Sequence, residues 1–333
     1  MMFGWEVDLY GSHGRKLAEC LEAAVLAPSV HNTQPWRLRL APGRVDVLLD
    51  RDRLLPVIDP GAREAWMSVG AAILNLRVAV LAAGRMPMSR LLPDPHTPEH
   101  AATITFGGPH QPDETIQMLA GAIPKRRTNR RPFRDIEVRD EVLDQLTAAA
   151  RVEGARLAVT DPVIREAVLS LALTANQWQR SDPAYVEELR TWTAVPDDST
   201  SGIPARSLGP VDARGALPLR DFGLAHPEAP RRIAPFEYAP TVAIVYTAGD
   251  TPLDWLRAGQ AMERVLLTAT VRGVCNTPIT APTELPELRA LLGDEHIGQV
   301  AQVILRLGYG NPVPSTPRRP VRDVIEIAEP SVR

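Results

Sequence analysis

The sequence contains very little cysteine: Cys20 and Cys275 are the only two cysteines among 333 residues, and they form no Cys-x-x-Cys pair. Zinc ribbons and disulfide-stapled secreted domains are therefore excluded. The beginning of the chain also lacks the basic and then apolar layout of a signal peptide. These absences predict a protein of a reducing compartment, and we expect that compartment to be the cytoplasm.

Long apolar runs and an excess of basic residues are also missing. The most apolar stretch, 69–83, carries Asn75 and Arg77 and is too short to span a bilayer comfortably. The net charge is −3, from 37 basic and 40 acidic residues, whereas nucleic-acid binders are usually basic. We therefore expect neither a membrane nor a nucleic acid as partner.

The common nucleotide and metal motifs are absent or broken. No Gly-x-Gly-x-x-Gly follows a predicted strand, and no Gly-x-x-x-x-Gly-Lys-Ser/Thr occurs. Residues 96–100 have the His-x-x-Glu-His order of some zinc peptidases, but Pro98 at the centre breaks the helix that this motif requires. No metal is expected.

Hydrophobic periodicity predicts an α+β fold. Residues 86–100 are rich in proline and are expected to form a loop, and the irregular segment 194–240 is too long for an ordinary connector. Pro183 should interrupt or bend the helix that precedes it. The other expected elements are helices at 17–25, 66–83, 114–123, 141–150, 163–178 and 255–271, and strands at 36–40, 45–49, 101–106, 155–159, 241–246 and 300–307.

Two of these helices suggest a diluted internal repeat. Trp66 precedes Gly70 by the same four residues that separate Trp255 from Gly259, and a further glycine follows each at the same spacing. The alternative is that two amphipathic helices align a few small residues by chance. A repeat predicts two fused halves, 1–112 and 113–333, of which the second includes 194–240.

A polar turn in the first half is the first candidate site. Ser29, Asn32 and Gln34 lie between Pro28 and Pro35, just before a predicted strand. Such side chains can bind a planar heterocycle or a ribityl hydroxyl. A hydrogen-bonded Asx turn without a ligand explains the pattern equally well.

An arginine-rich segment in the second half is the second candidate site. Residues 125–134 contain six cations, interleaved with Thr128 and Asn129. Arginine presents a planar fork of donors that suits phosphate. A solvated basic face is the alternative. The turn 316–320, with Arg318 and Arg319, could add a second phosphate contact, although a surface turn is the commoner explanation.

Together, Ala27–Trp36 and Arg126–Phe133 resemble the two signature segments of the FMN-dependent nitroreductase family, and 302–320 is similar to its C-terminal segment. In ordinary members, two subunits of about half this length each supply one motif to a shared site. Here each motif occurs once, which resembles the Acg-type branch. The resemblance implies a nitroreductase-like fold, an internal pseudo-dimer that is monomeric in solution, and a lid insertion at 194–240.

The resemblance also implies the roles of individual residues. Arg127, Asn129 and Arg131 match the Arg-Ser-Arg pattern, with Asn129 in place of serine, and either Arg131 or Arg127 would stabilise charge on the reduced flavin. Thr277 to Ile279 occupy the place where the family presents a backbone amide to the flavin. The implied FMN-binding residues are Ser29, Asn32, Gln34, Arg127, Asn129, Arg131, Thr277, Pro278, Ile279, Arg318 and Arg319.

The implied activity is reduction of a nitro, quinone or similar small-molecule acceptor by reduced FMN, with NAD(P)H as the donor. No catalytic side chain beyond the flavin is required, because the flavin ring itself carries the electrons. An alternative is a protein that sequesters or stores FMN beneath a closed lid without NAD(P)H turnover. A third possibility is a specialised oxidation of a biosynthetic intermediate.

Overall fold

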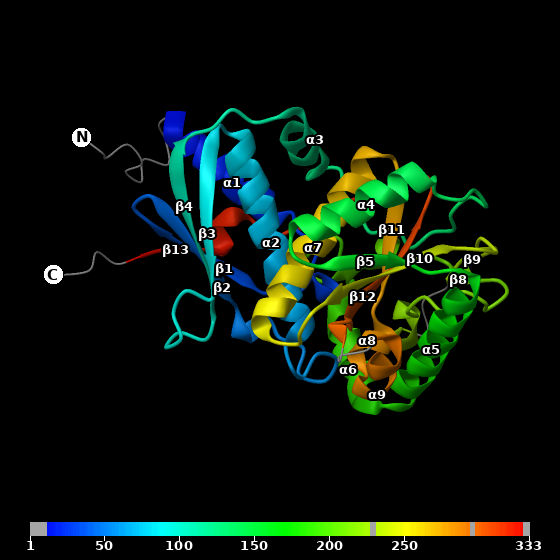
Figure 1. Ribbon diagram of the computed structural model, residues 1–333. Helices are drawn as coiled ribbons and strands as arrows, with labels where there is room; N and C mark the ends of the chain where they lie inside the picture. The colour runs from blue at the N-terminus through cyan, green and yellow to red at the C-terminus, as the bar shows by residue number, and fades with distance from the viewer. Residues whose placement is uncertain (1–11, 227–230, 294–296, 329–333) are drawn as a thin grey trace.

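The computed structural model of the protein describes residues 12–226, 231–293 and 297–328. Two long helices, α2 (Arg63–Ala82) and α7 (Pro252–Val271), cross in the middle, and one β-sheet lies on each side of them (Figure 1). Most strand pairs in both sheets are antiparallel. The α+β class predicted from the sequence is confirmed.

The first sheet is built mainly from the first half of the chain. Alternate residues of β1 are buried, and Trp36, Leu38 and Leu40 pack in one core with α2 and with α1 (Ser12–Val25). Gly43 has φ +71°, so it supplies the left-handed turn between the first two strands. The strands, in sheet order, are β13 (Ile325–Ile327), β1 (Trp36–Ala41), β2 (Arg44–Leu49), β4 (His100–Pro109) and β3 (Arg85–Leu91).

The second sheet is built from the second half. Every residue of its central strand β12 is buried, because helices or connecting segments cover both faces. One face packs on α7 and α4 (Asp140–Val152), and the other packs on α5 (Pro162–Ser181). The strands, in sheet order, are β11 (Cys275–Ile279), β12 (Val300–Gly308), β10 (Thr241–Thr247) and β5 (Arg156–Val159).

Several shorter elements complete the chain. Pro183 ends one helix and begins another, because it occupies the first turn of α6 (Pro183–Trp192), capped by Asp182. The described part of 194–240 has little regular structure, as expected. The remaining helices are α3 (Glu114–Ala122), α8 (Ala281–Glu284) and α9 (Pro286–Arg289), and the remaining short strands are β6 (Thr193–Val195), β7 (Ile203–Pro204), β8 (Val211–Asp212) and β9 (Ile233–Ala234).

The prediction of a loop at 86–100 is wrong for its first part, because β3 occupies Arg85–Leu91. Pro87 does not prevent this, since within the described ranges β3 pairs only with β4 and lies at the edge of the sheet. The strand is largely exposed and therefore lacks the alternation of apolar residues that marks a half-buried strand.

The last strand joins the two halves. After β12 the chain leaves the second sheet, and β13 then pairs in parallel with β1, with Ile325 opposite Leu38 (Figure 1). The chain therefore contributes its C-terminal segment to the sheet of its first half. This crossing also carries the turn 316–320 past the polar turn that precedes β1.

The two central helices approach closely at one glycine from each. A Cβ atom on Gly259 would lie 1.9 Å from the carbonyl oxygen of Met67, and one on Gly70 would lie 2.3 Å from that of Leu256. The glycines that the predicted repeat aligns thus meet each other at the helix crossing.

Among the described residues, α2 is the one helix long and apolar enough to cross a membrane, and 78% of its apolar window is buried.

Replacing Gly259 by alanine should destabilise the protein by about 1–3 kcal/mol, the usual cost of overpacking. This loss should appear although alanine favours helix formation by about 1 kcal/mol. Gly121 in α3 is the matched control, since nothing lies within 4 Å of the Cβ it would gain. Urea unfolding of both variants measures the difference. Equal or higher stability of Gly259→Ala would contradict the close crossing.

Candidate functional site

The turn before β1 has a strained backbone. His31, Asn32 and Gln34 have φ values of 44°, 57° and 54°, in the left-handed region that costs a residue other than glycine about 1 kcal/mol or more. Hydrogen bonds hold this conformation: Ser29 Oγ accepts from the amide of Gln34 at 2.9 Å, and Ser68 Oγ of α2 accepts from that of Val30 at 3.1 Å. Strain retained in this way is typical of functional sites.

The two amide side chains of this turn tie three segments together. Asn32 Nδ2 donates to the carbonyl oxygens of Gly202 and Pro317, at 2.9 and 3.0 Å. Gln34 Nε2 donates to Thr200 O at 2.9 Å, and its Oε1 accepts from the amide of Arg319 at 2.8 Å. Both side chains therefore join the turn to 194–240 and to the C-terminal turn.

The arginine-rich segment is attached to the second sheet through β11. Thr128 forms an isolated parallel bridge with Asn276, and the amide of Asn129 donates to Asn276 O at 2.8 Å. The Asn129 side chain is buried and donates to Asn311 O at 3.0 Å. Asn129 thus supports the backbone of the segment.

Several arginines converge on a cavity of about 340 Å³, which we call the arginine cavity. Its walls come from the arginine-rich segment, the turn before β1, part of 194–240 and the C-terminal turn. No Asp or Glu lies among its lining residues, so its charge is strongly positive. The cationic lining residues are Arg126, Arg127, Arg130, Arg131, Arg206 and Arg318.

A second cavity, also of about 340 Å³, has mainly apolar walls, and we call it the apolar cavity. Met67 and Met262 come from the two central helices, and Leu217 and Phe222 come from 194–240. Thr277 and Pro278 line it from β11. Four residues line both cavities, so the cavities adjoin: Pro28, Ser29, Thr128 and Arg130.

Arg130, at this junction, is a half-buried cation that forms no ion pair with a carboxylate within the described residues. It donates to Ser207 O at 3.2 Å, and its guanidinium lies 4.8 Å from the ring centroid of Phe222. Burial, followed by repulsion from Arg220, lowers its pKa to about 10. Because uncompensated buried charge is costly, the junction favours an anionic or electron-rich ligand.

A buried carboxyl group lies behind the arginine cavity. Glu263 of α7 has its Oε1 3.5 Å from Arg126 Nε, and both side chains are almost fully buried. Burial raises the pKa of Glu263 to about 7, although Arg126 and Arg318 oppose this shift. Burial, followed by repulsion from Arg126, lowers the pKa of Arg318 to about 9.

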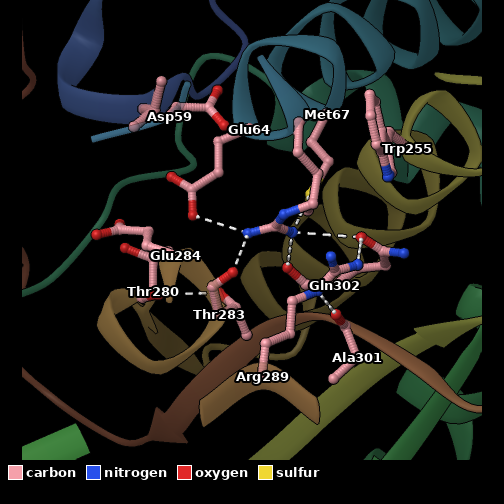
Figure 2. A network of polar contacts seen from close by, with 12 residues as sticks. Asp59, Glu64, Met67, Trp255, Thr280, Thr283, Glu284, Arg289, Ala301 and Gln302 are labelled. Carbon is pink, nitrogen blue, oxygen red and sulfur yellow. Dashed lines mark hydrogen bonds and ion pairs between the residues drawn. The ribbon is translucent and has the colours of Figure 1, made fainter. Parts of the chain in front are cut away.

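A buried polar network lies beside the apolar cavity (Figure 2). At its centre, Arg63 of α2 donates to Gln302 O at 2.5 Å, to Thr283 O at 2.9 Å and to Glu64 Oε1 at 3.3 Å. Glu64 also lines the apolar cavity, and burial followed by repulsion from Glu284 raises its pKa. The network ties the first central helix to the second sheet.

Only some of the predicted site residues line one of the two cavities. Gln34, Asn129 and Arg319 line neither cavity, and the Ile279 side chain packs in the core. Ser29 lines both cavities. Thr277 and Pro278 line the apolar cavity, and the residues lining the arginine cavity alone are Asn32, Arg127, Arg131 and Arg318.

The prediction from sequence omitted Thr128 and Arg130, which line both cavities. The family pattern was placed on Arg127, Asn129 and Arg131, so the alternate residues between them were left out. The hydroxyl of Thr128 was the available signal, because threonine resembles the serine of that pattern more closely than asparagine does. Arg126, His31, Glu64 and Arg220 were also omitted, although each lines a cavity.

No family model matches the chain. It is 34% identical over 320 residues to Mycobacterium tuberculosis Rv3131, which is provisionally named an NAD(P)H nitroreductase; the match covers 94% of this chain and 92% of the relative. It is 32% identical over 318 residues to Acg of the same organism, provisionally given the same activity, over 93% and 95% of the two chains.

Solved structures that resemble the chain are more distant. One is a protein from Anabaena variabilis described as a nitroreductase, with a TM-score of 0.48, 12% identity and coverage of 89% of this chain and 88% of that one. Another is a nitroreductase with bound FMN from Desulfitobacterium hafniense, with a TM-score of 0.37, 15% identity and coverage of 66% and 100%.

The raised pKa of Glu263 predicts a pH-dependent stability. Between the ordinary pKa of 4.5 and about 7, the folded state holds more protons than the unfolded state. The free energy of unfolding therefore falls as pH rises through this range, by on the order of 3 kcal/mol from this group. Glu263→Gln should remove this loss, so its melting temperature should vary less between pH 4.5 and 8.

The exposed Glu187 provides a matched control, since its side chain is 70% exposed on α6. Glu187→Gln should leave the pH dependence of the wild type unchanged. Thermal unfolding of the two variants and the wild type in the absence of ligand measures the effect. An identical pH dependence in Glu263→Gln would exclude Glu263 as the group that titrates.

Proposed function

The chain belongs to the nitroreductase family, and we propose that it is an FMN-dependent oxidoreductase of the Acg-type branch. NAD(P)H would be the donor, and a nitro compound, a quinone or a similar small molecule would be the acceptor. The observation that carries the proposal is the junction of an arginine-lined cavity with an apolar one. FMN has the matching shape and charge, since a phosphate is joined through a polar chain to a flat ring system.

The residues of the two cavities divide naturally between the parts of FMN. We propose that Arg127, Arg131 and Arg318 bind the phosphate, since guanidinium groups pair well with phosphate oxygens. Ser29 and Thr128, at the junction, would bind the ribityl hydroxyls. Gln34, Asn129 and Arg319 would hold the walls in place through their backbone contacts.

The ring system would occupy the apolar cavity, bordered by Thr277 and Pro278 of β11. FMN, when bound, would supply the two-electron chemistry of the reaction. Arg130 is half-buried and has no carboxylate partner among the described residues, so it is suited to stabilise negative charge near it. We assign to Arg130 the electrostatic role that the family pattern gave to Arg131 or Arg127.

The site also depends on both parts of the chain. We propose that 1–112 and 113–333 are two fused halves of an internal pseudo-dimer, which would be monomeric in solution. The first half supplies the turn before β1, and the second supplies the arginine-rich segment. Segment 194–240 lines both cavities, which supports a role as a lid over the bound molecule.

Removing the charge of Arg130 tests the proposed cofactor. Arg130→Met should weaken FMN binding about 10- to 150-fold, because a hydrogen bond to a charged group contributes about 1.5–3 kcal/mol. Arg134→Met is the control, since Arg134 is exposed and lines neither cavity. Flavin fluorescence titration of protein stripped of flavin measures both affinities. Equal affinities in the two variants would remove Arg130 from the site, and failure of the wild type to bind FMN would remove the proposal.

Turnover distinguishes an oxidoreductase from a protein that only stores FMN. The observation that favours storage is that 194–240 contributes wall residues to both cavities. NADPH or NADH added without oxygen should rapidly bleach the absorbance of protein-bound FMN, and a quinone should then restore it. Persistence of the oxidised spectrum, with free FMN reduced chemically as a control, would favour storage instead.

A further inference from the structure

His31 lies where the turn before β1 meets 194–240. It is 6% exposed, it lines the apolar cavity, and its backbone is in the left-handed region. The ring of Phe222 meets its imidazole edge to face, with centroids 5.7 Å apart. His31 has no role in the proposed function.

The charges around His31 keep its imidazole neutral. Arg220 and Arg130 are the charged groups that act on it, and both are cations. Burial lowers the pKa of His31 well below its ordinary value, and Arg220 and then Arg130 lower it further. A neutral imidazole carries one proton, on either Nδ1 or Nε2.

Arg220 determines which nitrogen carries that proton. Its Nη1 lies 3.0 Å from His31 Nε2, and a guanidinium can only donate hydrogen bonds. Nε2 is therefore the acceptor, and the proton resides on Nδ1. Nδ1 is buried and has no hydrogen-bond partner within the described structure.

Arg220 itself is held firmly by residues of the second half of the chain. Its Nη2 donates to Thr280 Oγ1 at 2.8 Å and forms a buried ion pair with Glu284 of α8. Burial lowers the pKa of Arg220, but the charge of Glu284 outweighs it and raises the pKa above its ordinary value, so the guanidinium keeps its charge. The tautomer of His31 is thus fixed by contacts among the first half, 194–240 and the second half.

We infer that His31 is a ligand-binding residue of the apolar cavity and that its Nδ1–H donates a hydrogen bond to an oxygen of the molecule bound there. His31 lines the apolar cavity, and its buried Nδ1 has no hydrogen-bond partner among the described residues. This unpaired donor is the observation that points to a ligand, since buried donors are normally paired. The acceptor is a carbonyl or nitro oxygen, which belongs either to the flavin ring or to the electron acceptor. This inference rests on the proposed function for the identity of the bound molecule.

A neutral imidazole that donates a hydrogen bond does not transfer a proton. Because the pKa of His31 lies well below its ordinary value of 6.5, its contribution should not change as pH passes through 6.5. The role resembles that of a fixed electrophile, which stabilises charge developing on the oxygen without changing its own protonation state.

Nitrogen NMR of protein labelled with ¹⁵N-histidine tests the inference directly. In the free protein, the His31 signals, assigned by their loss in His31→Phe, should show the Nδ1–H tautomer and no titration near the ordinary pKa of 6.5. Addition of oxidised FMN, and then of nitrobenzene, should shift the Nδ1–H proton downfield and slow its exchange. A shift with FMN alone identifies a flavin carbonyl, and a shift only with nitrobenzene identifies the acceptor oxygen.

Binding measurements on two variants supply a second readout. His31→Phe keeps an aromatic ring but has no donor, so the affinity for the molecule identified by NMR should fall on the order of fivefold, as expected for one neutral hydrogen bond. His31→Asn tolerates the left-handed backbone and retains a donor, so it should restore part of the affinity.

The role of Arg220 as a positioning residue is tested with the same spectra. Arg220→Gln should release the fixed tautomer and bring the pKa of His31 closer to its ordinary value. Arg214→Gln removes another arginine of 194–240, one that contacts Phe236 O, and should leave the His31 signals unchanged.

Three results would overturn the inference: an Nε2–H tautomer, titration of His31 near pH 6.5, or an Nδ1–H signal that neither molecule shifts. The fluorescence titration on the same samples separates this failure from failure of the proposed function. If FMN binds and NADPH reduces it while His31 remains unperturbed, the inference alone is wrong. If no flavin binds, the proposed function fails first.

Discussion

The close crossing of α2 and α7 determines where everything else can lie. Gly70 and Gly259 let the two backbones approach to a distance that any side chain would prevent. Each helix covers its own sheet, so the crossing fixes the distance between the sheets as well. The turn before β1 and the arginine-rich segment are then brought to the same interface, although about 100 residues separate them. Both cavities form at this interface.

The pairing of buried arginines is a second constraint on the structure. Arg306, one of the largest fully buried side chains, pairs with Glu237 and stacks 3.6 Å from the ring centroid of Phe133. Arg220 pairs with Glu284, and Arg63 donates mainly to carbonyl oxygens. Arg130 differs from Arg306 and Arg220 in that no carboxylate among the described residues pairs with it.

The sequence predicted the long elements well because their signals are local. The alternation of apolar residues in Trp36–Leu40 indicates a strand buried on one face, and the structure has β1 there. The apolar residues of 66–83 indicate a helix buried nearly all around, and the structure has α2 there. It could not predict β13, which has three residues and depends on pairing with a strand nearly 290 positions earlier. Strand β11 was also missed, since Pro278 argues against a strand, yet Pro278 still pairs opposite Leu305.

The sequence identified the segments that form the site more reliably than the individual residues that line it. The turn and the arginine-rich segment do meet, but a motif does not say which side of an extended segment faces a cavity. Asn129 is turned to the backbone of Asn311, whereas its neighbours Thr128 and Arg130 line both cavities. His31 could not be selected because its significance depends on Arg220, which is 189 residues away.

The chain takes different routes after helices α1 and α4. After α1 the chain makes the polar turn that lines the cavities, whereas after α4 it passes through Glu153 directly into β5. Glu153 is buried and binds Arg77 of α2 at 2.5 Å and Arg264 of α7 at 2.7 Å. One carboxylate thus satisfies an arginine from each central helix at this position. The polar turn after α1 thus lines the two cavities, whereas the position after α4 holds a buried ion-pair cluster.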